Sequence, residues 1–284
     1  MAAKNGREEC GNAACPGGWR GWWKDHRRPM LEGRWGCSPG CLETMARAAL
    51  RREAGGEQPA EPEGEHRHRM PLGLILLGQG WITPEQLQRA MERQRRVGRG
   101  PIGAWLTEEC GLEPSCVTRG LGLQWGCPVL SAGEFDPQAM ALAAPQVLVE
   151  RLGMVPLRVA GGRLLYLGFA GRPDWAAALA MERISGLKVE SGLLEEMEWR
   201  AARQRLCACE FVDAELEPVE RIELLPGRIA AALVRMQPRA SRLVRVHEFH
   251  WLRMWLDSRA MGASGLPQSK EDVADRVYVV GREA

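Results

Sequence analysis

Lysine is scarce in this chain of 284 residues, which has only four, at positions 4, 24, 188 and 270. None of them follows a glycine, so the chain lacks the G-x-x-x-x-G-K-[ST] loop whose lysine holds phosphates in P-loop hydrolases. The H-E-x-x-H helix of metalloproteases is also missing. We therefore expect no ATP hydrolysis by this chain, and no other enzymatic activity.

Long apolar runs and strong net charge are missing as well. No run approaches the roughly 18 apolar residues of a membrane span, and the first thirty residues lack the apolar centre of a signal peptide. The formal net charge is +2, and the arginine bias with 33 glycines indicates a GC-rich coding sequence rather than a nucleic-acid surface. We expect a cytoplasmic protein with no membrane span, and we do not expect nucleic acid as its partner.

What is present is a unit of about thirty residues written twice. Its recurring pairs are Arg69 and Arg99, Pro71 and Pro101, Gly73 and Gly103, Leu76 and Leu106, Pro84 and Pro114, Arg89 and Arg119, and Gln94 and Gln124. Each copy predicts two short helices; in the first, Thr83 caps a helix that begins at Pro84. We expect Leu76, Leu87, Met91 and Leu106 to be buried. Two helical hairpins that pack on each other would be enough to account for this apolar pattern.

The helical periodicity does not explain why the glycines and the terminal glutamines recur in both copies. Gly73 and Gly103 are poor helix formers, which indicates close approach of the backbone, either to the other copy or to a ligand. With the leucine series inside each copy, these residues resemble the N-terminal domain of type II secretion and type IV pilus assembly ATPases, often called the MshEN domain. The resemblance continues through Val155-Pro156-Leu157-Arg158 and covers roughly residues 70–206.

Some members of that family bind cyclic di-GMP through an arginine before the leucine-glycine pair and through the closing glutamine. Here Pro71 and Pro101 stand at the arginine positions, and Cys110 replaces a family glycine. The resemblance therefore implies either a degenerate, protein-binding copy of the fold or a weak nucleotide site. The candidate ligand-binding residues of such a site are Arg69, Gly73, Gln94, Arg99, Gly103 and Gln124.

The first fifty residues hold four of the nine cysteines. Cys10, Cys15, Cys37 and Cys41 form two close pairs, the second at the start of a predicted helix, which suits four thiolates around one zinc. The segment resembles small zinc-ribbon knuckles, although four residues rather than two separate the first pair. The alternatives are unliganded thiols in a loose tail and His26 as a substitute ligand. We expect Trp19, Trp22, Trp23 and Trp35 to pack around the metal.

The predicted fold class is α+β, with duplicated helical hairpins followed by a small mixed layer and preceded by the zinc-knuckle-like module. Its expected divisions are the cysteine-rich module at 1–53, a linker at 54–69, the duplicated helices at 70–126, the α/β half at 127–206 and a C-terminal extension at 207–284. Because the linker separates the cores, loss of the metal should leave the chain after Met70 folded. His66 and His68 give only a weak metal pattern.

Two hairpin-forming strands are expected on either side of Gly161-Gly162, then a helix, a short strand and a last helix before residue 207. Residues 242–256 predict one long strand that pairs with residues 275–280; a helix from Phe249 is the alternative. At strand spacing His247 and His250 face opposite sides, which favours a structural role for them over a metal or acid-base site with Glu248. Cys207 and Cys209 form only one close pair.

Three functional hypotheses follow. The first is a non-enzymatic adaptor in which a zinc knuckle is tethered to a secretion-ATPase-like domain that docks on a protein of a secretion or pilus apparatus. The second is a sensor of cyclic di-GMP or a related guanine nucleotide. The third is a nucleic-acid-binding zinc-knuckle protein. The predicted cofactors are accordingly zinc and, for the second hypothesis, cyclic di-GMP.

Overall fold

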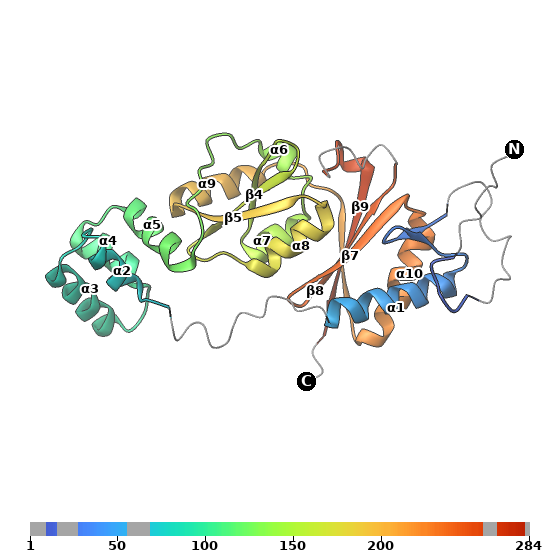
Figure 1. The fold of residues 1–284 in the computed structure, drawn as a ribbon, viewed down its shortest axis with the longest axis horizontal. Helices are drawn as coiled ribbons and strands as arrows, with labels where there is room; N and C mark the ends of the chain where they lie inside the picture. Colours follow the sequence, from blue (N-terminus) through green and yellow to red (C-terminus); the bar gives the residue numbers. More distant parts are fainter. Residues whose placement is uncertain (1–9, 16–27, 56–68, 258–265, 282–284) are drawn as a thin grey trace, which may run out of the picture.

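The computed structural model describes residues 10–15, 28–55, 69–257 and 266–281. Figure 1 shows an elongated molecule with three parts in a row: a group of helices at one end, a small sheet with helices in the middle, and a larger sheet at the other end. The α+β fold class is therefore confirmed. None of the described helices combines the length and the apolarity that crossing a bilayer requires.

The four helices at one end are the two sequence copies. They are α2 (Leu72–Gly78), α3 (Pro84–Val97), α4 (Ile102–Cys110) and α5 (Pro114–Trp125). The second pair begins at 102 and 114, each thirty residues after the start of its counterpart at 72 and 84. Thr83 and Gln86 cap α3 reciprocally, with Pro84 in its first turn, as expected.

The helical core is small. Leu76 and Leu106 are fully buried, as the pattern predicted. Leu87, which was also expected to be buried, is only half-buried. The expectation for Met91 was wrong, because its side chain is 37% exposed. Successive residues of a helix point about 100° apart, and the neighbouring Ala90 takes the position that faces the core.

The middle part is a three-stranded sheet with helices packed against it. Its strands are β3 (Val155–Ala160), β4 (Leu164–Ala170) and β5 (Lys188–Leu194), in that order. Its helices are α6 (Pro137–Met140), α7 (Gln146–Leu152), α8 (Trp175–Ser185) and α9 (Glu196–Cys207). The β3–β4 hairpin turns at Gly161 and Gly162, both with positive φ, and α8 connects the parallel pair β4 and β5.

The last part is a four-stranded sheet of order β6-β9-β8-β7. Its elements are β6 (Ala214–Val219), η2 (Ile222–Leu224), α10 (Leu225–Met236), β7 (Ala240–Val246), β8 (Phe249–Trp255), η4 (Lys270–Asp272) and β9 (Val273–Val280). The single long strand expected over 242–256 was wrong, and so was the alternative helix. The chain reverses at His247, whose φ is 51°, so that β7 and β8 form a hairpin and β8 pairs with β9.

The N-terminal segment lies on this last sheet, as Figure 1 shows. It consists of β1 (Met30–Leu31), β2 (Arg34–Trp35) and α1 (Pro39–Gly55). Leu42 and Ala46 of α1 share one core with Ile229 and Leu233 of α10. The expectation of separate cores on the two sides of the linker was wrong, because the apolar face of α1 is covered by residues about 180 positions later in the chain.

Candidate functional sites

Four cysteine sulfurs meet where β2 leads into α1. The Sγ atoms of Cys10, Cys15, Cys37 and Cys41 all lie within 4.8 Å of one another. Cys15 and Cys37 are 3.4 Å apart and Cys37 and Cys41 are 3.5 Å apart, close to the roughly 3.8 Å between thiolates that each lie about 2.3 Å from a tetrahedral ion. The four cysteines could therefore hold one metal ion.

Local structure brings these sulfurs together. Ser38 caps α1 by accepting a hydrogen bond from the backbone N–H of Cys41, so that Cys37 and Cys41 flank the first turn of the helix. The backbone N–H of Cys37 donates to the sulfur of Cys10, and Asn12 donates to that of Cys41. Such donors favour thiolates and orient them as ligands.

The thiols differ in acidity. Burial alone would raise the pKa of Cys41, but hydrogen bonds from Asn12 and Ser38 outweigh it and bring that pKa to about 7. Burial raises the pKa of Cys37 well above its ordinary value, with further contributions from hydrogen bonds to the neighbouring cysteines, and burial also raises that of Cys10. Cys41 thus gives up its proton more readily than Cys10 or Cys37.

Residues 36–40 also spell G-x-S-x-G, the pattern around the nucleophile of α/β hydrolases. In that fold the serine follows a strand of the central sheet and bonds to a histidine. Here the preceding strand has two residues, and Ser38 is engaged as the cap of α1. In the structure as described, Ser38 has no hydrogen bond to a histidine. We assign it to the frame of the cysteine cluster.

The aromatic surroundings of the cluster are described only in part. Trp35 is half-buried, and the guanidinium of Arg28 lies 4.5 Å from its ring centroid. Three further tryptophans and three histidines named from the sequence lie outside the described residues: Trp19, Trp22, Trp23, His26, His66 and His68.

In the duplicated helices, the two closing glutamines make matching contacts. Gln94 donates through Nε2 to the carbonyl of Gly100 at 2.7 Å, and Gln124 donates to that of Met70 at 2.8 Å. Gly100 and Met70 occupy the same position in the repeat. Each glutamine therefore ties the end of one copy to the start of the other, which gives the recurrence of this residue a structural reason.

The recurring glycines also have a packing reason. A Cβ atom on Gly73 would lie 2.6 Å from Cδ1 of Leu87, and one on Gly103 would lie 2.6 Å from Cγ1 of Val117. Leu87 and Val117 occupy the same position in the repeat, in α3 and α5. Each glycine thus lets the two helices of its own hairpin approach closely, although the sequence pointed to the other copy or a ligand.

The candidate ligand-binding residues fall into two groups rather than one. Arg69 stacks on Trp125 at 4.3 Å beside Gln124, and Arg172 approaches the same ring at 5.0 Å. Arg99 lies beside the Gln94 contact, where its carbonyl accepts a hydrogen bond from the indole of Trp105. Pairing of both arginine positions with tryptophans was not predicted from the sequence.

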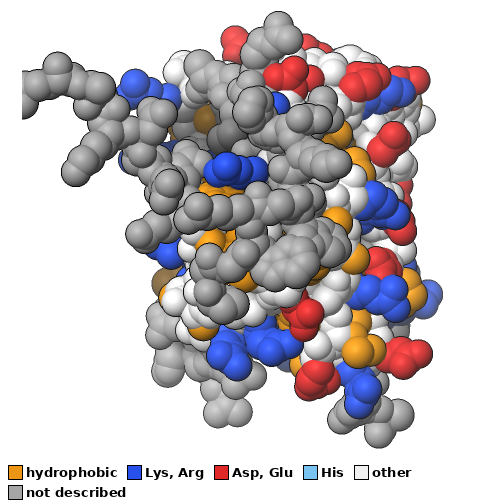
Figure 2. All heavy atoms as spheres, turned by 90° about the vertical axis from the view of Figure 1, so that its right-hand side faces the viewer, with side chains coloured by type: hydrophobic (Ala, Val, Ile, Leu, Met, Phe, Trp, Pro, Cys, Tyr) orange, Lys and Arg blue, Asp and Glu red, His pale blue; other side chains and the backbone are white. Residues whose placement is uncertain are grey.

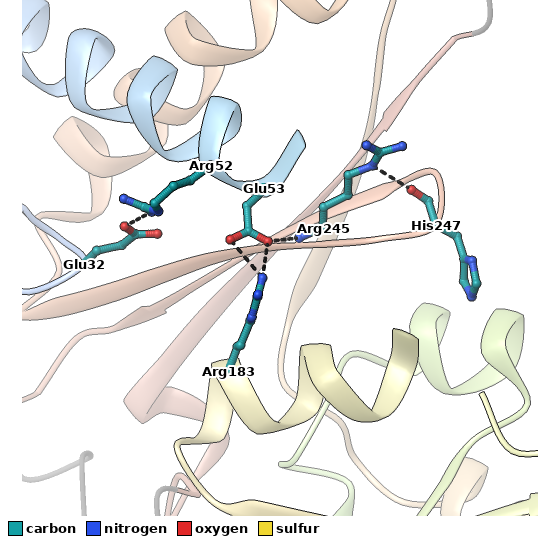
Figure 3. A network of polar contacts seen from close by, with 6 residues as sticks. All are labelled: Glu32, Arg52, Glu53, Arg183, Arg245 and His247. Carbon is teal, nitrogen blue, oxygen red and sulfur yellow. Dashed lines mark hydrogen bonds and ion pairs between the residues drawn. The ribbon is translucent and has the colours of Figure 1, made fainter. Parts of the chain in front are cut away.

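A polar network that the sequence did not reveal joins three separate elements (Figure 3). The buried carboxylate of Glu53, in α1, accepts two hydrogen bonds from Arg183 of α8 at 3.1 and 3.3 Å. Its Oε2 also accepts from the backbone N–H of Arg245 in β7 at 3.1 Å. Beside it, Arg52 bonds to Glu32. The network therefore connects α1 to α8 of the middle part and to β7 of the last sheet.

A fully buried ion pair lies between β8 and β9. Arg253 donates to both oxygens of Asp275 at 3.0 and 2.7 Å, and its remaining nitrogen donates to the carbonyl of Ala143 at 2.8 Å. Trp251 donates to the same carboxylate at 2.9 Å. Because Ala143 belongs to the segment between α6 and α7, the pair also links the last sheet to the middle part.

The fold and sites define an α+β protein in which a duplicated helical unit precedes a mixed sheet and a four-cysteine cluster is attached to a second sheet. No family model matches the chain. Among its relatives are type IV pilus assembly ATPases PilB from Myxococcus xanthus (28% identical over 139 residues, 48% of this chain and 24% of the relative) and Acinetobacter baylyi (27% over 122 residues, 42% and 21%).

A third PilB, from Thermus thermophilus, is 34% identical over 115 residues, which are 39% of this chain and 13% of the relative. The chain thus spans a quarter or less of the length of these curated relatives. Similar solved structures include MshE with cdg (TM-score 0.39, 23% identity, 49% of this chain and 99% of that chain) and the N-terminal domain of XpsE (0.33, 20%, 47% and 92%). The sequence matches support the resemblance to part of the type IV pilus assembly ATPases.

Proposed function

We propose that this chain is a non-enzymatic adaptor that docks on a protein of a type IV pilus or type II secretion apparatus through its duplicated helices. The observation that carries the proposal is the exposure of large apolar side chains in this unit: Met70 is 59% exposed, Leu74 51% and Leu123 57%. Apolar surface of this kind is a common mark of protein docking. The similarity to PilB supports a pilus apparatus as the place of docking, and we propose that the chain docks there in the cytoplasm.

Affinity capture tests the proposal. The tagged chain, cross-linked in its own cells, should recover components of the pilus or secretion apparatus, and the Leu74→Glu/Leu123→Glu variant should lose them. The matched control is Leu216→Glu, which adds a charge to a 47% exposed leucine of β6 outside the helical unit. Recovery of the same proteins by the double variant, with an unchanged melting temperature, would rule out these helices as the docking surface.

Zinc is the metal that we propose for the cysteine cluster. Four thiolates without a carboxylate or an open position are the ligand set of structural rather than catalytic zinc sites. The metal would hold residues 10–15 against the start of α1 and so complete the segment that lies on the last sheet. Elemental analysis of purified protein should find about one zinc per chain.

A cyclic di-GMP sensor is the second hypothesis, and the local contacts weigh against it. The amide groups of Gln94 and Gln124 already donate to backbone carbonyls, and proline occupies both family arginine positions. Calorimetric titration with cyclic di-GMP separates the hypotheses. We expect no measurable heat for the natural chain and gain of binding in the Pro71→Arg/Pro101→Arg variant; tight binding by the natural chain would favour the sensor.

The third hypothesis, nucleic-acid binding through the knuckle, has less support. Figure 2 shows the end of the molecule that carries the N-terminal segment, and on its described surface acidic and basic side chains are interspersed. Nucleic-acid-binding surfaces instead gather basic side chains on one face. A binding assay with duplex DNA at low salt should show no association.

A further inference from the structure

A cavity of about 960 Å³ lies at the edge of the last sheet, outside the helical unit. It is bounded by the end of α1, by η2 and the start of α10, by the β7–β8 turn and by the end of β9. Its apolar lining includes Leu50, Ile222, Pro226 and Val280. The volume is in the range of ordinary small-molecule sites.

The charged lining of this cavity has an excess of one positive charge. Three arginines, Arg47, Arg51 and Arg245, line it together with two carboxylates, those of Glu223 and Glu248. Arg47 already pairs with Glu43 at 2.9 Å. Within the described residues, neither Arg51 nor the terminal nitrogens of Arg245 have a carboxylate partner, and Figure 3 shows the Arg245 side chain bonded through Nε to the carbonyl of His247.

His250 supplies a third, independent feature. Its side chain lines the cavity and is only 7% exposed, and its Nδ1 has no hydrogen-bond partner in the part of the chain that the structure describes. Burial, and then the charge of Arg245, lower the pKa of His250 to about 4. The ring is therefore neutral near pH 7. Buried polar atoms usually have a hydrogen-bond partner, and Nδ1 of His250 has none among the described residues, so a polar group of a ligand could bond to it.

We infer that this cavity binds a small organic anion with an apolar body, such as an aromatic or aliphatic carboxylate, sulfonate or phosphate. The acid group lies between Arg51 and Arg245, whose guanidinium groups donate charge-assisted hydrogen bonds to it. The apolar body covers Ile222, which is otherwise 42% exposed. Neutral His250 bonds to a polar group of the ligand at the buried end. The helical docking surface has no part in this site.

Anilinonaphthalene sulfonate is a suitable probe, because it joins an aromatic body to one acid group and fluoresces more strongly in apolar sites. Titration of the full chain should show one saturable site. The Arg51→Gln/Arg245→Gln variant should bind about tenfold more weakly or worse, since a hydrogen bond to a charged group is generally of that size. Phenylnaphthylamine, which lacks the acid group, should bind the natural chain about tenfold more weakly than the sulfonate on the same basis.

Two further variants make the test decisive. Ala54→Trp fills the cavity from an exposed position on α1 and should abolish binding whether or not the arginine variant folds. Arg235→Gln is the matched control, because Arg235 lies on α10 outside the cavity and is 61% exposed. Unsaturable binding, or equal binding by the Ala54→Trp variant, would overturn the site. Equal affinity for both probes would overturn its assignment to an anion.

Discussion

The duplicated helices and the last sheet are stabilised in different ways. The helical unit has a core of only six buried residues, which come from one continuous stretch, and it leaves several large apolar side chains in solvent. The sheet buries Trp251, Trp255 and Tyr278 and depends on α1, which is about 180 positions earlier in the chain. Each helical copy packs against the copy next to it in the sequence. The core beside the sheet, in contrast, forms only when α1 packs against residues about 180 positions later in the chain.

Removal of the proposed zinc should give the largest difference between the two regions. Cys37→Ser should lower the zinc content from about one per chain and expose the backbone of α1 and β7 to hydrogen exchange, because structural zinc supplies on the order of 10 kcal/mol to small modules. Exchange in α2–α5 should not change. Hydrogen exchange with mass spectrometry measures both regions at once.

The matched control for that experiment is Cys110→Ser, which removes a thiol of the helical unit that lies outside the four-cysteine cluster. It should leave the zinc content as it is. Full protection of α1 in metal-free protein would show that packing alone holds the N-terminal segment on the sheet.

The buried ion pair should give the next largest effect. Arg253→Ala leaves Asp275 charged and buried without its partner, so we expect a loss of about 3–5 kcal/mol in the free energy of unfolding. Urea unfolding measures it. The control is Arg235→Ala, which breaks an exposed pair and should change stability by less than about 1 kcal/mol. Equal losses in the two variants would mean that the Arg253 pair does not stabilise the sheet.

Truncation of the repeated leucines tests whether the two helical copies are equivalent. Leu76→Ala and Leu106→Ala should each destabilise the helical unit by about 2–5 kcal/mol, because both side chains are fully buried. Met91→Ala should change stability by only about 0.5 kcal/mol, since Met91 faces solvent. Thermal melts of the three variants give the comparison. An unchanged melting temperature for Leu76→Ala would contradict the shared core.

The last sheet should lose stability as the pH falls below neutrality, because of His250. The pKa of His250 is about 4 in the folded chain against about 6.5 when unfolded, so protonation favours the unfolded state. The stability from the neutral ring is complete above pH 6.5 and is lost as the pH falls towards 4, on the order of 3 kcal/mol in total. The free energy of unfolding, measured at several pH values, should depend less steeply on pH in His250→Gln than in the natural chain. The same pH dependence of stability in the natural chain and in His250→Gln would exclude His250 as the cause.

Local patterns predicted much of the helical unit. The thirty-residue offset located both hairpins, and Thr83-Pro84 gave the start of α3, because caps and turns depend on residues close in sequence. Met91 was misassigned since periodicity alone leaves the edge of a helix face undefined. The reversal at His247 was missed because a non-glycine residue with positive φ gives no clear sequence signal.

By itself, the sequence determined the duplicated helices, the glycine turn between β3 and β4, and the four cysteines that come together at one point. Only the tertiary structure decided that α1 completes the last sheet, that Glu53 joins Arg183 to β7, and that a cationic cavity forms beside His250. The difference is one of sequence separation. The repeat, the turn and the cysteine spacing each lie within about thirty residues of sequence, whereas these contacts join positions more than a hundred residues apart.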